Sequence, residues 1–309
     1  FLITFGINFV YAEPVVNDVN YIVEEFANGF TFPTAIEFVE NGMLVIERLN
    51  GKVYHIDNIE NDPKLVLELN VDGGAETGLL GITSVNSDVY LYFTETTPDT
   101  DETLGNRIYK YFWDGHSLTN PILVNDFPFH KSNSHVGGSL THDNDGNVFI
   151  ITGDMSAADY NYEGPLQNNP SGEYNDNGAV ILVGFDPSIT RPSNLENPLS
   201  HYYAIGIRNS FGLTVDPKTN FLWDTENGPN FYDEINFVEK NSNSGWSVIM
   251  GPASQDELKR IPQIENYFYS DPEFTWKATV APTALTFTQS EFFNSYNDYL
   301  FVADCMGGN

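Results

Sequence analysis

The amino-acid sequence predicts an all-β protein, a six-bladed β-propeller whose last blade is incomplete in this chain. Three observations support this fold class. Five segments repeat the same order of strand, turn and strand, the strand segments are rich in β-branched and aromatic residues, and no long stretch has helical periodicity. Strands separated by Gly, Asn, Asp and Pro turns, without helices between them, argue against a βαβ architecture.

The five repeated units follow one pattern along the chain. Each has a strand that opens with small residues, a turn, and a second hydrophobic strand that ends in an acid. The units cover residues 33–47, 78–95, 138–154, 211–226 and 282–304. Further strands are expected at residues 51–56, 107–112, 179–185 and 234–238. The spacing of the units exceeds that of a minimal propeller blade, which indicates inserted loops.

The sequence stops soon after the fifth unit, so we expect one propeller domain over residues 21–309 that lacks the end of its sixth blade. The longest insertion, Ser156 to Asn177, is rich in Gly, Asn, Ser and Pro. Insertions in repeat folds collect on one face, so we expect this one beside the functional site. Together with residues 96–105, it is expected to select the substrate.

Composition and charge exclude several classes of partner. Of 309 residues, 41% are hydrophobic, which is too many for a disordered chain. Thirteen basic residues against forty-three acidic ones give a formal net charge of −30. A field of this sign repels nucleic acids and anionic membranes, so we expect neither as a partner. We interpret the acidity as a solvated surface suited to a salty or calcium-rich medium.

The first twelve residues form an apolar run that ends in the small residue Ala12. This pattern is typical of the hydrophobic and cleavage regions of a secretory signal, and we interpret residues 1–12 as the remnant of one. The alternative is a buried first strand. No later stretch approaches a membrane span. We therefore expect a secreted or periplasm-like protein, and its one cysteine, Cys305, cannot form an intrachain disulfide.

His135 stands just before the inner strand of the third unit, and Asp154 stands at the end of that unit. A His at the start of an inner strand faces the central channel of a propeller or its mouth. An acid one strand later can orient the imidazole as a general base. The alternative is structural: His135 caps a turn and Asp154 bonds backbone amides at a strand end. Taken alone, the pair favours this alternative.

Polar residues stand at the same place in three consecutive units. Glu76 precedes the second unit, His135 the third, and Arg208 with Asn209 the fourth. Core packing does not explain this, because small residues or Pro would serve at the start of an inner strand. An acid, a base and a cation that converge on one centre are typical of a functional pocket. With these residues included, the functional interpretation is favoured.

The segment from Glu226 to Trp246 adds a cation site to this prediction. It places three acids, Glu226, Asp233 and Glu234, around a Gly-Pro turn. Acids beside backbone carbonyls that such a turn leaves unpaired suit Ca²⁺, which takes about six to eight oxygen ligands. The Arg-Asn pair shortly before the segment can bind a planar, oxygen-rich anion.

Together these motifs resemble the glucose/sorbosone dehydrogenase family, the soluble six-bladed propellers that use pyrroloquinoline quinone (PQQ) and Ca²⁺. The resemblance runs from about Phe26 to Asp304 and is specific because four motifs occur in order. They are Glu76-Thr-Gly-Leu-Leu-Gly, His135-Val-Gly-Gly-Ser-Leu with Gly153-Asp154, Gly206-Ile-Arg-Asn-Ser-Phe-Gly-Leu, and Glu226-Asn-Gly-Pro-Asn-Phe-Tyr-Asp-Glu with Gly245-Trp246.

The resemblance implies a role for each matching residue of the catalytic centre. His135 corresponds to the general base, which takes the proton of the sugar's anomeric hydroxyl as hydride passes to the quinone. Asp154 corresponds to the acid that orients this histidine. Arg208 and Asn209 correspond to residues that bind PQQ, and the Arg also stabilises charge developing on the quinone oxygen.

Two calcium sites are implied in the same way. The carbonyls of Gly228 and Pro229 correspond to those that hold the catalytic Ca²⁺, which polarises the quinone as a Lewis acid. Glu234 corresponds to a ligand of a second, structural Ca²⁺, with the carbonyl of Ser244 as its partner.

Glu76 and Thr279 fall at further cofactor contacts, and the sequence departs from the family near both. Glu76 replaces the more usual Gln and places an extra negative charge near an anionic cofactor. The Lys or Arg residues that some members supply to the PQQ carboxylates have no clear match after Thr279, and Lys277 is the nearest candidate. Residues 247–254 do not reproduce additional Ca²⁺ ligands of some members. These departures concern the affinity for PQQ more than the fold.

The sequence therefore predicts an exported quinoprotein dehydrogenase that oxidises aldose sugars at C1 to lactones and passes electrons to an external acceptor. Two other functions stay open. One is a non-catalytic, Ca²⁺-dependent propeller that binds a glycan or a protein, because fold does not determine function. The other is a Ca²⁺-dependent lactonase, which would not need the Arg208-Asn209 pair.

Overall fold

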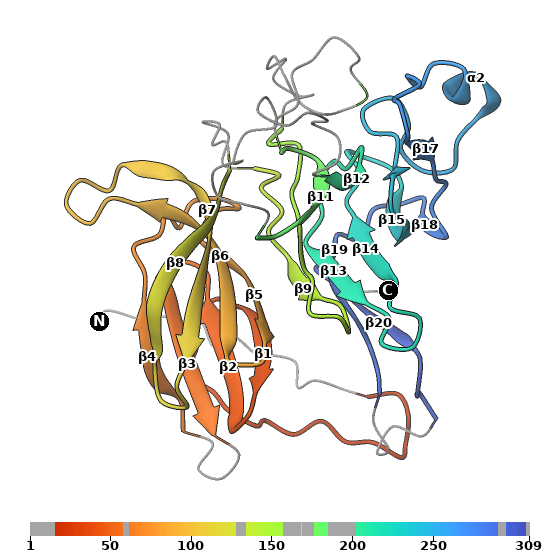
Figure 1. Cartoon of the computed structure of the whole chain (residues 1–309). Helices are drawn as coiled ribbons and strands as arrows, with labels where there is room; N and C mark the ends of the chain where they lie inside the picture. The colour runs from red at the N-terminus through yellow and green to blue at the C-terminus, as the bar shows by residue number, and fades with distance from the viewer. Residues whose placement is uncertain are drawn as a thin grey trace, which may run out of the picture.

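The computed structural model describes residues 16–57, 62–127, 134–156, 168, 176–184, 202–289 and 295–306. These residues form five β-sheets and a short helix, α2 (Gln255–Leu258), which begins with a capping box of Ser254 and Glu257. Figure 1 shows the sheets following one another around the molecule in chain order. The predicted all-β fold is confirmed, while the predicted signal remnant at residues 1–12 lies outside the described residues.

The first two sheets are four-stranded antiparallel meanders in which neighbours in sequence pair with each other. The first sheet contains β1 (Pro33–Val39), β2 (Gly42–Glu47), β3 (Lys52–Asp57) and β4 (Lys64–Glu68). The second contains β5 (Leu79–Val85), β6 (Asp88–Thr96), β7 (Thr103–Trp113) and β8 (Leu118–Phe127). Asn86, at the two-residue turn between β5 and β6, has a φ of 56°, a conformation that Asn tolerates better than most residues.

The third sheet begins in the same way and is then extended by a segment from elsewhere. Its own strands are β9 (Leu140–His142), β10 (Val148–Ile151), β11 (Ala179–Leu182) and β12 (Tyr202–Ile205). Two short strands, β16 (Ser242–Asn243) and β17 (Phe268–Tyr269), continue it in parallel beyond β12. Both lie between two strands of the fourth sheet in sequence. The chain therefore crosses from the fourth sheet to the outer edge of the third and back.

The fourth and fifth sheets complete the described fold. The fourth contains β13 (Gly212–Val215), β14 (Leu222–Glu226), β15 (Asp233–Val238) and β18 (Phe274–Trp276). The fifth contains β19 (Pro282–Phe287) and β20 (Leu300–Asp304). In the β14–β15 ladder, Glu226 lies opposite Glu234 and Asp224 lies opposite Asn236. This register places three acids and an amide on one face of the ladder, because side chains alternate between faces.

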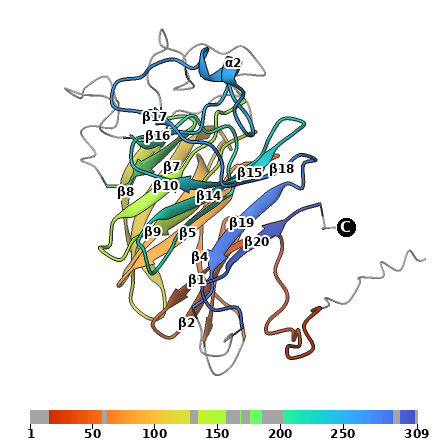
Figure 2. The same ribbon diagram turned by 90° about the vertical axis from the view of Figure 1, so that its right-hand side faces the viewer.

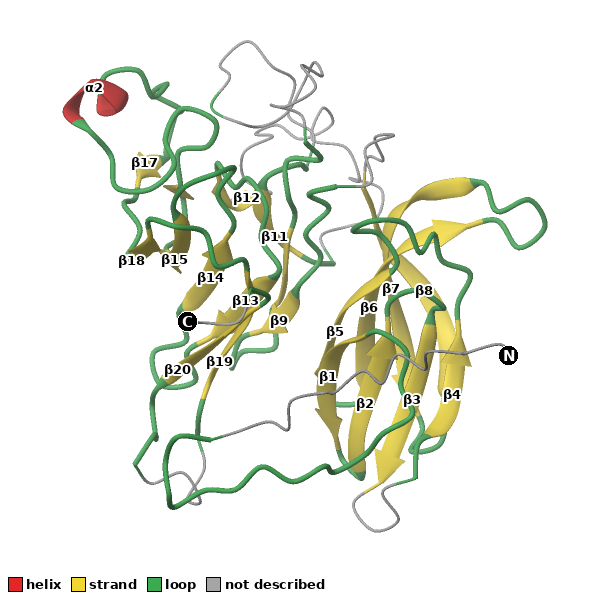
Figure 3. Ribbon diagram, turned by 180° about the vertical axis from the view of Figure 1, so that it is seen from behind, coloured by secondary structure: helices red, strands yellow, loops and turns green. Residues whose placement is uncertain are grey.

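The five predicted units correspond one to one to the first two strands of the five sheets. Strands β3, β7, β11 and β15 correspond to the four further strands that we predicted. The first strands of successive sheets contact each other in the order β1, β5, β9, β13, β19, as blades do around a propeller axis (Figure 2). The described sheets do not close into a ring. In Figure 3, the first sheet (β1–β4) and the β19–β20 pair lie on opposite sides of the molecule.

Apolar side chains fill the spaces between successive sheets. One buried cluster joins the first and second sheets, another joins the second and third, and another joins the third and fourth. Tyr92, at the centre of the second cluster, is fully buried, and its hydroxyl donates to the carbonyl of Val136 at 3.2 Å. This hydrogen bond from a core residue therefore also holds the segment that leads from His135 into β9.

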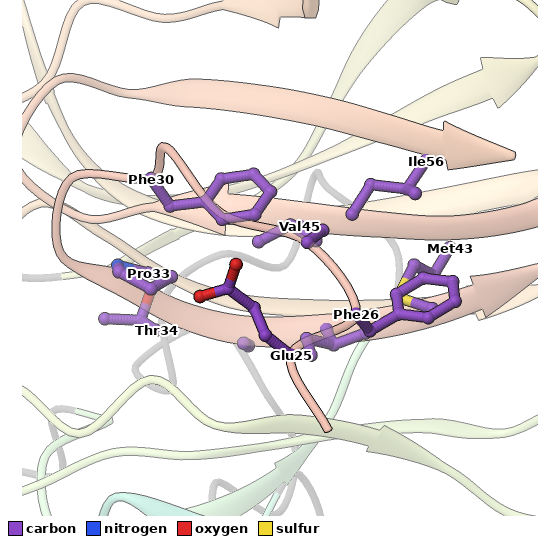
Figure 4. A pocket seen from close by; sticks show the side chains of 11 residues that line it. Glu25, Phe26, Phe30, Pro33, Thr34, Met43, Val45 and Ile56 are labelled. Carbon is purple, nitrogen blue, oxygen red and sulfur yellow. The ribbon is translucent and has the colours of Figure 1, made fainter. Parts of the chain in front are cut away.

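The segment before β1 connects the two ends of the row of sheets. The Tyr296 hydroxyl, before β20, donates to Asp18 at 2.8 Å, while the Phe30 ring packs edge-on against Tyr54 of β3 at 5.7 Å. The segment borders an apolar pocket of about 380 Å³ on the face of the first sheet (Figure 4). No predicted site residue lines this pocket. Its lining includes Glu25, Phe26, Phe30, Pro33, Met43, Val45 and Ile56.

Candidate active site

His135 and Asp154 form a buried hydrogen-bonded pair in the third sheet. The imidazole Nδ1 lies 2.6 Å from Asp154 Oδ1, and the two side chains are 10% and 1% exposed. The carboxylate of Asp154 also accepts from the Ser156 amide at 2.8 Å and, through Oδ2, from the Trp246 indole at 2.8 Å. Both oxygens of the Asp154 carboxylate are therefore engaged in hydrogen bonds. In the tautomer whose Nδ1–H donates to Asp154, His135 Nε2 keeps a lone pair.

The backbone around this pair has one unusual conformation and one close approach. His135 has a φ of 56°, in the left-handed region that costs a residue with a side chain about 1 kcal/mol or more. Gly153 comes so close that a Cβ there would lie 2.1 Å from the His135 carbonyl oxygen. The amide of Met155 donates to that same oxygen at 3.1 Å. The turn before β9 and the end of the third unit are thus tied together at the histidine.

Side chains from three consecutive sheets meet at His135. Glu76, just before β5, accepts from the His135 amide at 2.5 Å. The same oxygen, Oε2, lies 3.5 Å from Nδ2 of Asn209, just before β13. The structure therefore brings together the residues at the three equivalent positions. Their roles in binding or catalysis stay predictions.

Arg208 links the third and fourth sheets. Its carbonyl accepts from the Asp154 amide at 2.7 Å, and its own amide donates to Glu226 Oε1 at 2.6 Å. The guanidinium donates to the carbonyl of Asn227 at 2.8 Å and lies over the Trp246 ring, with Cζ 5.2 Å from the ring centroid. A guanidinium over an indole face is attracted by the ring quadrupole. The side chain of Arg208 is thus held in one direction while 7% of the residue remains exposed.

The Gly228-Pro229 turn lies between β14 and β15 and is braced by Asp233. One oxygen of Asp233 accepts from the Gly228 amide at 2.9 Å, and the other accepts from the amides of Val280 and Ala281 at 2.6 and 2.8 Å. Thr279 directly precedes Val280, so the bonds to Asp233 bring it close to the Gly228-Pro229 turn. Among the described residues, no donor occupies the carbonyls of Gly228 and Pro229.

Four polar side chains are buried on one face of the β14–β15 ladder. Asp224, Glu226, Glu234 and Asn236 are each at most 6% exposed. Asn236 Nδ2 donates to Asp224 at 2.9 Å and to Glu234 at 3.3 Å, and the Gly251 amide also donates to Glu234. This is far fewer donors than three carboxylates can accept.

Burial raises the pKa of each carboxyl group in this acid cluster of Asp224, Glu226 and Glu234. The pKa of Asp224 rises to about 8 and that of Glu234 to about 7. Burial raises the pKa of Glu226 well above its ordinary range, and the charges of Glu234 and Asp224 raise it further. Without a cation, the cluster therefore retains protons in a pH range where exposed acids have lost them.

The buried atoms that lack partners at this site are mainly acceptors. They include Asn209 Oδ1 and Asn227 Oδ1, on two segments that the bond from the Asn227 amide to the Asn209 carbonyl joins, and Glu226 Oε2 and Asp224 Oδ2 in the acid cluster. Unpartnered buried oxygens suit a hard cation, which binds oxygen ligands. No group of three or more His, Cys, Asp or Glu side chains in the described parts of the chain is placed to hold a metal ion. A cation at the turn would therefore depend on carbonyl and amide oxygens, and such donors fit Ca²⁺.

One predicted pair is not joined directly. Glu234 bonds Gly251, which lies in the loop after Ser244, while the Ser244 amide donates to Ile205 of the third sheet at 3.0 Å. The structure thus brings Glu234 to this loop without showing a contact with Ser244 itself. The predicted insertion from Ser156 to Asn177 lies largely outside the described residues.

Sequence reasoning missed three connections within the site. These are the bond from Trp246 to Asp154, the brace that Asp233 forms, and the bond from the Arg208 amide to Glu226. An Asp five residues after Gly228 is a detectable signal for a braced turn, because Asp side chains often accept from nearby amides. The contact of Trp246 depends on the crossing segment and leaves no comparable local pattern.

Comparison with known proteins identifies the family. The glucose/sorbosone dehydrogenase family model matches residues 30–307, so the chain belongs to this family. A curated relative, quinoprotein glucose dehydrogenase B of Acinetobacter calcoaceticus, is 28% identical over 303 residues, which cover 84% of this chain and 63% of that protein. This chain therefore spans less than two thirds of the relative's length.

Solved structures agree on the fold. A putative oxidoreductase (glucose dehydrogenase) of Thermus thermophilus superposes with a TM-score of 0.69 at 25% identity, covering 91% of this chain and 78% of that one. The PQQ-bound aldose sugar dehydrogenase of Streptomyces coelicolor has a TM-score of 0.65 at 23% identity, covering 86% and 74%. None of the described residues belongs to a helix that is long and apolar enough to cross a membrane.

Proposed function

We propose that this protein is an exported, PQQ- and Ca²⁺-dependent dehydrogenase that oxidises aldose sugars at C1 to lactones. The observation that carries the proposal is the His135–Asp154 pair, in which Nδ1 is engaged at 2.6 Å and Nε2 has no hydrogen-bond partner among the described residues. Glu76 draws this histidine and Asn209 to one point. Membership of the family and the quinoprotein relative support the same conclusion.

The residues of this chain supply proton transfer and orientation. His135 Nε2 accepts the proton of the C1 hydroxyl, and the buried carboxylate of Asp154 stabilises the imidazolium that results. The C1 hydrogen leaves with both electrons of its bond, so that C1 and its oxygen become the lactone carbonyl. Bound PQQ would supply the acceptor for this hydride, and bound Ca²⁺ would supply Lewis acidity that strengthens the acceptor.

The proposed cofactor contacts follow from the donors and acceptors at the site. Arg208 would interact with the oxygens of PQQ from its place over the Trp246 ring, and Asn209 would contribute its unpartnered Oδ1. The carbonyls of Gly228 and Pro229 would hold the catalytic Ca²⁺. Thr279 would contact the cofactor from the segment that Asp233 ties to this turn.

Glu234, with backbone oxygens rather than the other two carboxylates of the acid cluster, is proposed to bind the structural Ca²⁺. Glu234 would be one ligand, and the loop that Gly251 holds against it would bring the Ser244 carbonyl. Three buried carboxyl groups with raised pKa values lower the stability of the metal-free protein near neutral pH. A divalent cation bound to Glu234 would remove the part of this cost that comes from Glu234.

The general base is tested by the variant His135→Gln. We expect sugar oxidation to fall by about 10²–10⁴-fold, because proton abstraction loses its base. The matched control is His142→Gln, which changes a histidine that bonds Thr83 at 3.0 Å, away from Asp154. Wild-type turnover in the His135 variant, with an unchanged unfolding temperature, would contradict the assignment.

Export is tested separately. The apolar run before Glu13 supports it, and we expect the chain recovered outside the cytoplasm to start near Glu13. Amino-terminal sequencing of the exported protein checks this. A retained apolar run or strictly cytoplasmic protein would contradict it.

A further inference from the structure

Trp246 contacts the two sides of the candidate active site with one side chain. Its indole Nε1 donates to Asp154 Oδ2 at 2.8 Å, and the face of its ring lies 5.2 Å from the Arg208 guanidinium carbon. The residue is 8% exposed. The indole thus connects the acid that orients His135 with the cation proposed to bind the cofactor.

The backbone of Trp246 is held firmly in this place. Its amide donates to the Gly206 carbonyl at 3.0 Å, and its carbonyl accepts from Asn168 at 2.7 Å. Asn168 exchanges two amide hydrogen bonds with Asn243, at 2.6 and 2.9 Å, and Asn243 belongs to β16. The pairing of β16 with β12 therefore fixes where the indole enters the site. The crossing segment therefore has a function at the site, although the third sheet itself does not require this segment.

The Asp154 carboxylate needs a donor on each oxygen to keep one orientation. Oδ1 accepts from His135 and from the Ser156 amide, at 2.6 and 2.8 Å. Within the described parts of the chain, Trp246 is the only donor to Oδ2. Removal of the indole N–H would leave a buried carboxylate oxygen unpaired, which strongly favours rotation toward another donor or toward water.

We propose that Trp246 is a positioning residue that holds the Asp154 carboxylate, and through it His135, in the orientation for proton transfer. It also supports the Arg208 side chain by stacking. The inference rests on the proposed function in one respect, the use of His135 as the base. The hold on Asp154 itself is a property of the protein without cofactor, so it can be measured independently.

The test uses Trp246→Phe, which keeps an aromatic face under Arg208 and removes the indole N–H. In the cofactor-free protein, the short His135–Asp154 hydrogen bond should give a far-downfield proton resonance in ¹H NMR spectra, assigned by its loss in His135→Gln. We expect this resonance to shift or broaden in Trp246→Phe. The control Trp223→Phe changes a tryptophan that packs on Phe237 and Phe287, and it should leave the resonance unchanged.

Kinetics add a second readout. We expect kcat of Trp246→Phe to fall about tenfold, with the KM for sugar nearly unchanged, because one charge-assisted hydrogen bond to a positioning group is lost. Unchanged resonance and unchanged kcat would overturn the proposal. If the wild-type protein oxidises no sugar, the proposed function fails, and the resonance alone then decides whether Trp246 holds Asp154.

A measurement on the wild-type protein covers the case in which Trp246→Phe does not fold. With ¹⁵N-labelled tryptophan, the indole N–H of Trp246 should exchange slowly with solvent, because it is bonded to the carboxylate of a buried residue, Asp154. In Asp154→Ala this protection should be lost. Exchange as fast as that of the partly exposed Trp223 in the wild-type protein would overturn the proposal.

Discussion

Replacement of Asp224 by Asn should stabilise the metal-free protein increasingly as the pH rises from about 4 to about 8. Asp224 is fully buried, burial raises the pKa of its carboxyl group to about 8, and Oδ2 lacks a partner among the described residues. In the variant, the amide oxygen can still accept from Asn236, and an NH₂ group replaces the unpartnered oxygen. The variant therefore keeps the existing hydrogen bond and never carries the charge.

The sign and size of the effect follow from proton linkage. The pKa of Asp224 in the folded protein lies above its ordinary value of 3.8, so the folded protein binds this proton more tightly than the unfolded chain does. The stability that the proton contributes is complete below about pH 4 and is lost as the pH rises through about 8. Each pH unit in this window costs about 1.4 kcal/mol of unfolding free energy, so the loss is bounded by about 6 kcal/mol.

Thermal unfolding in the presence of a chelator at pH 4, 6 and 8 measures this difference. We expect equal unfolding temperatures for the wild type and Asp224→Asn at pH 4, and a variant that is more stable by several degrees at pH 8. The control Asp256→Asn removes one charge from the exposed surface of α2 and should not reproduce the change. A variant that is less stable than the wild type at pH 8 would show that the fold stabilises the ionised carboxylate.

Three further predictions follow from other contacts. Gly153→Ala places a Cβ 2.1 Å from the His135 carbonyl oxygen, so the histidine has to move. We expect kcat to fall by about 10²-fold as a result. An unchanged kcat would contradict the close approach of the two segments. Glu37→Ala removes the acceptor that the Ser84 amide and hydroxyl share at 2.9 and 2.6 Å, and chemical denaturation should show a loss of about 1–3 kcal/mol. Ca²⁺ at 100 times its Kd should stabilise the metal-free protein by about 2.7 kcal/mol, and Glu234→Gln should abolish most of this increment in thermal scans.

The sequence predicted the repeated part of the fold well, because strand signals are local. Alternating apolar residues and turn residues locate all five hairpins and the third strand of four sheets. Strands β16 and β17 have two residues each, too few for any periodicity, so neither they nor the crossing segment could be predicted. The pairing of these strands depends on tertiary contacts of Asn243 and Asn168.

The convergence of the site was predictable for a related reason. Glu76, His135 and Asn209 precede equivalent strands, and equivalent positions in successive blades lie on one rim, so their contacts follow from the repeat. The contacts of Trp246 and Asp233 instead join segments that the repeat does not relate. Which residues donate to which oxygen therefore required the structure.

The proposed function requires that this site bind PQQ with Ca²⁺ and use it to oxidise an aldose. The most direct measurement is the visible spectrum of the purified protein after addition of PQQ and Ca²⁺, recorded before and after an aldose is added. We predict stoichiometric binding of the quinone, followed by a sugar-dependent change of its spectrum that is much slower in His135→Gln. Failure to bind PQQ in the presence of Ca²⁺ would contradict this function and favour a Ca²⁺-dependent binding module.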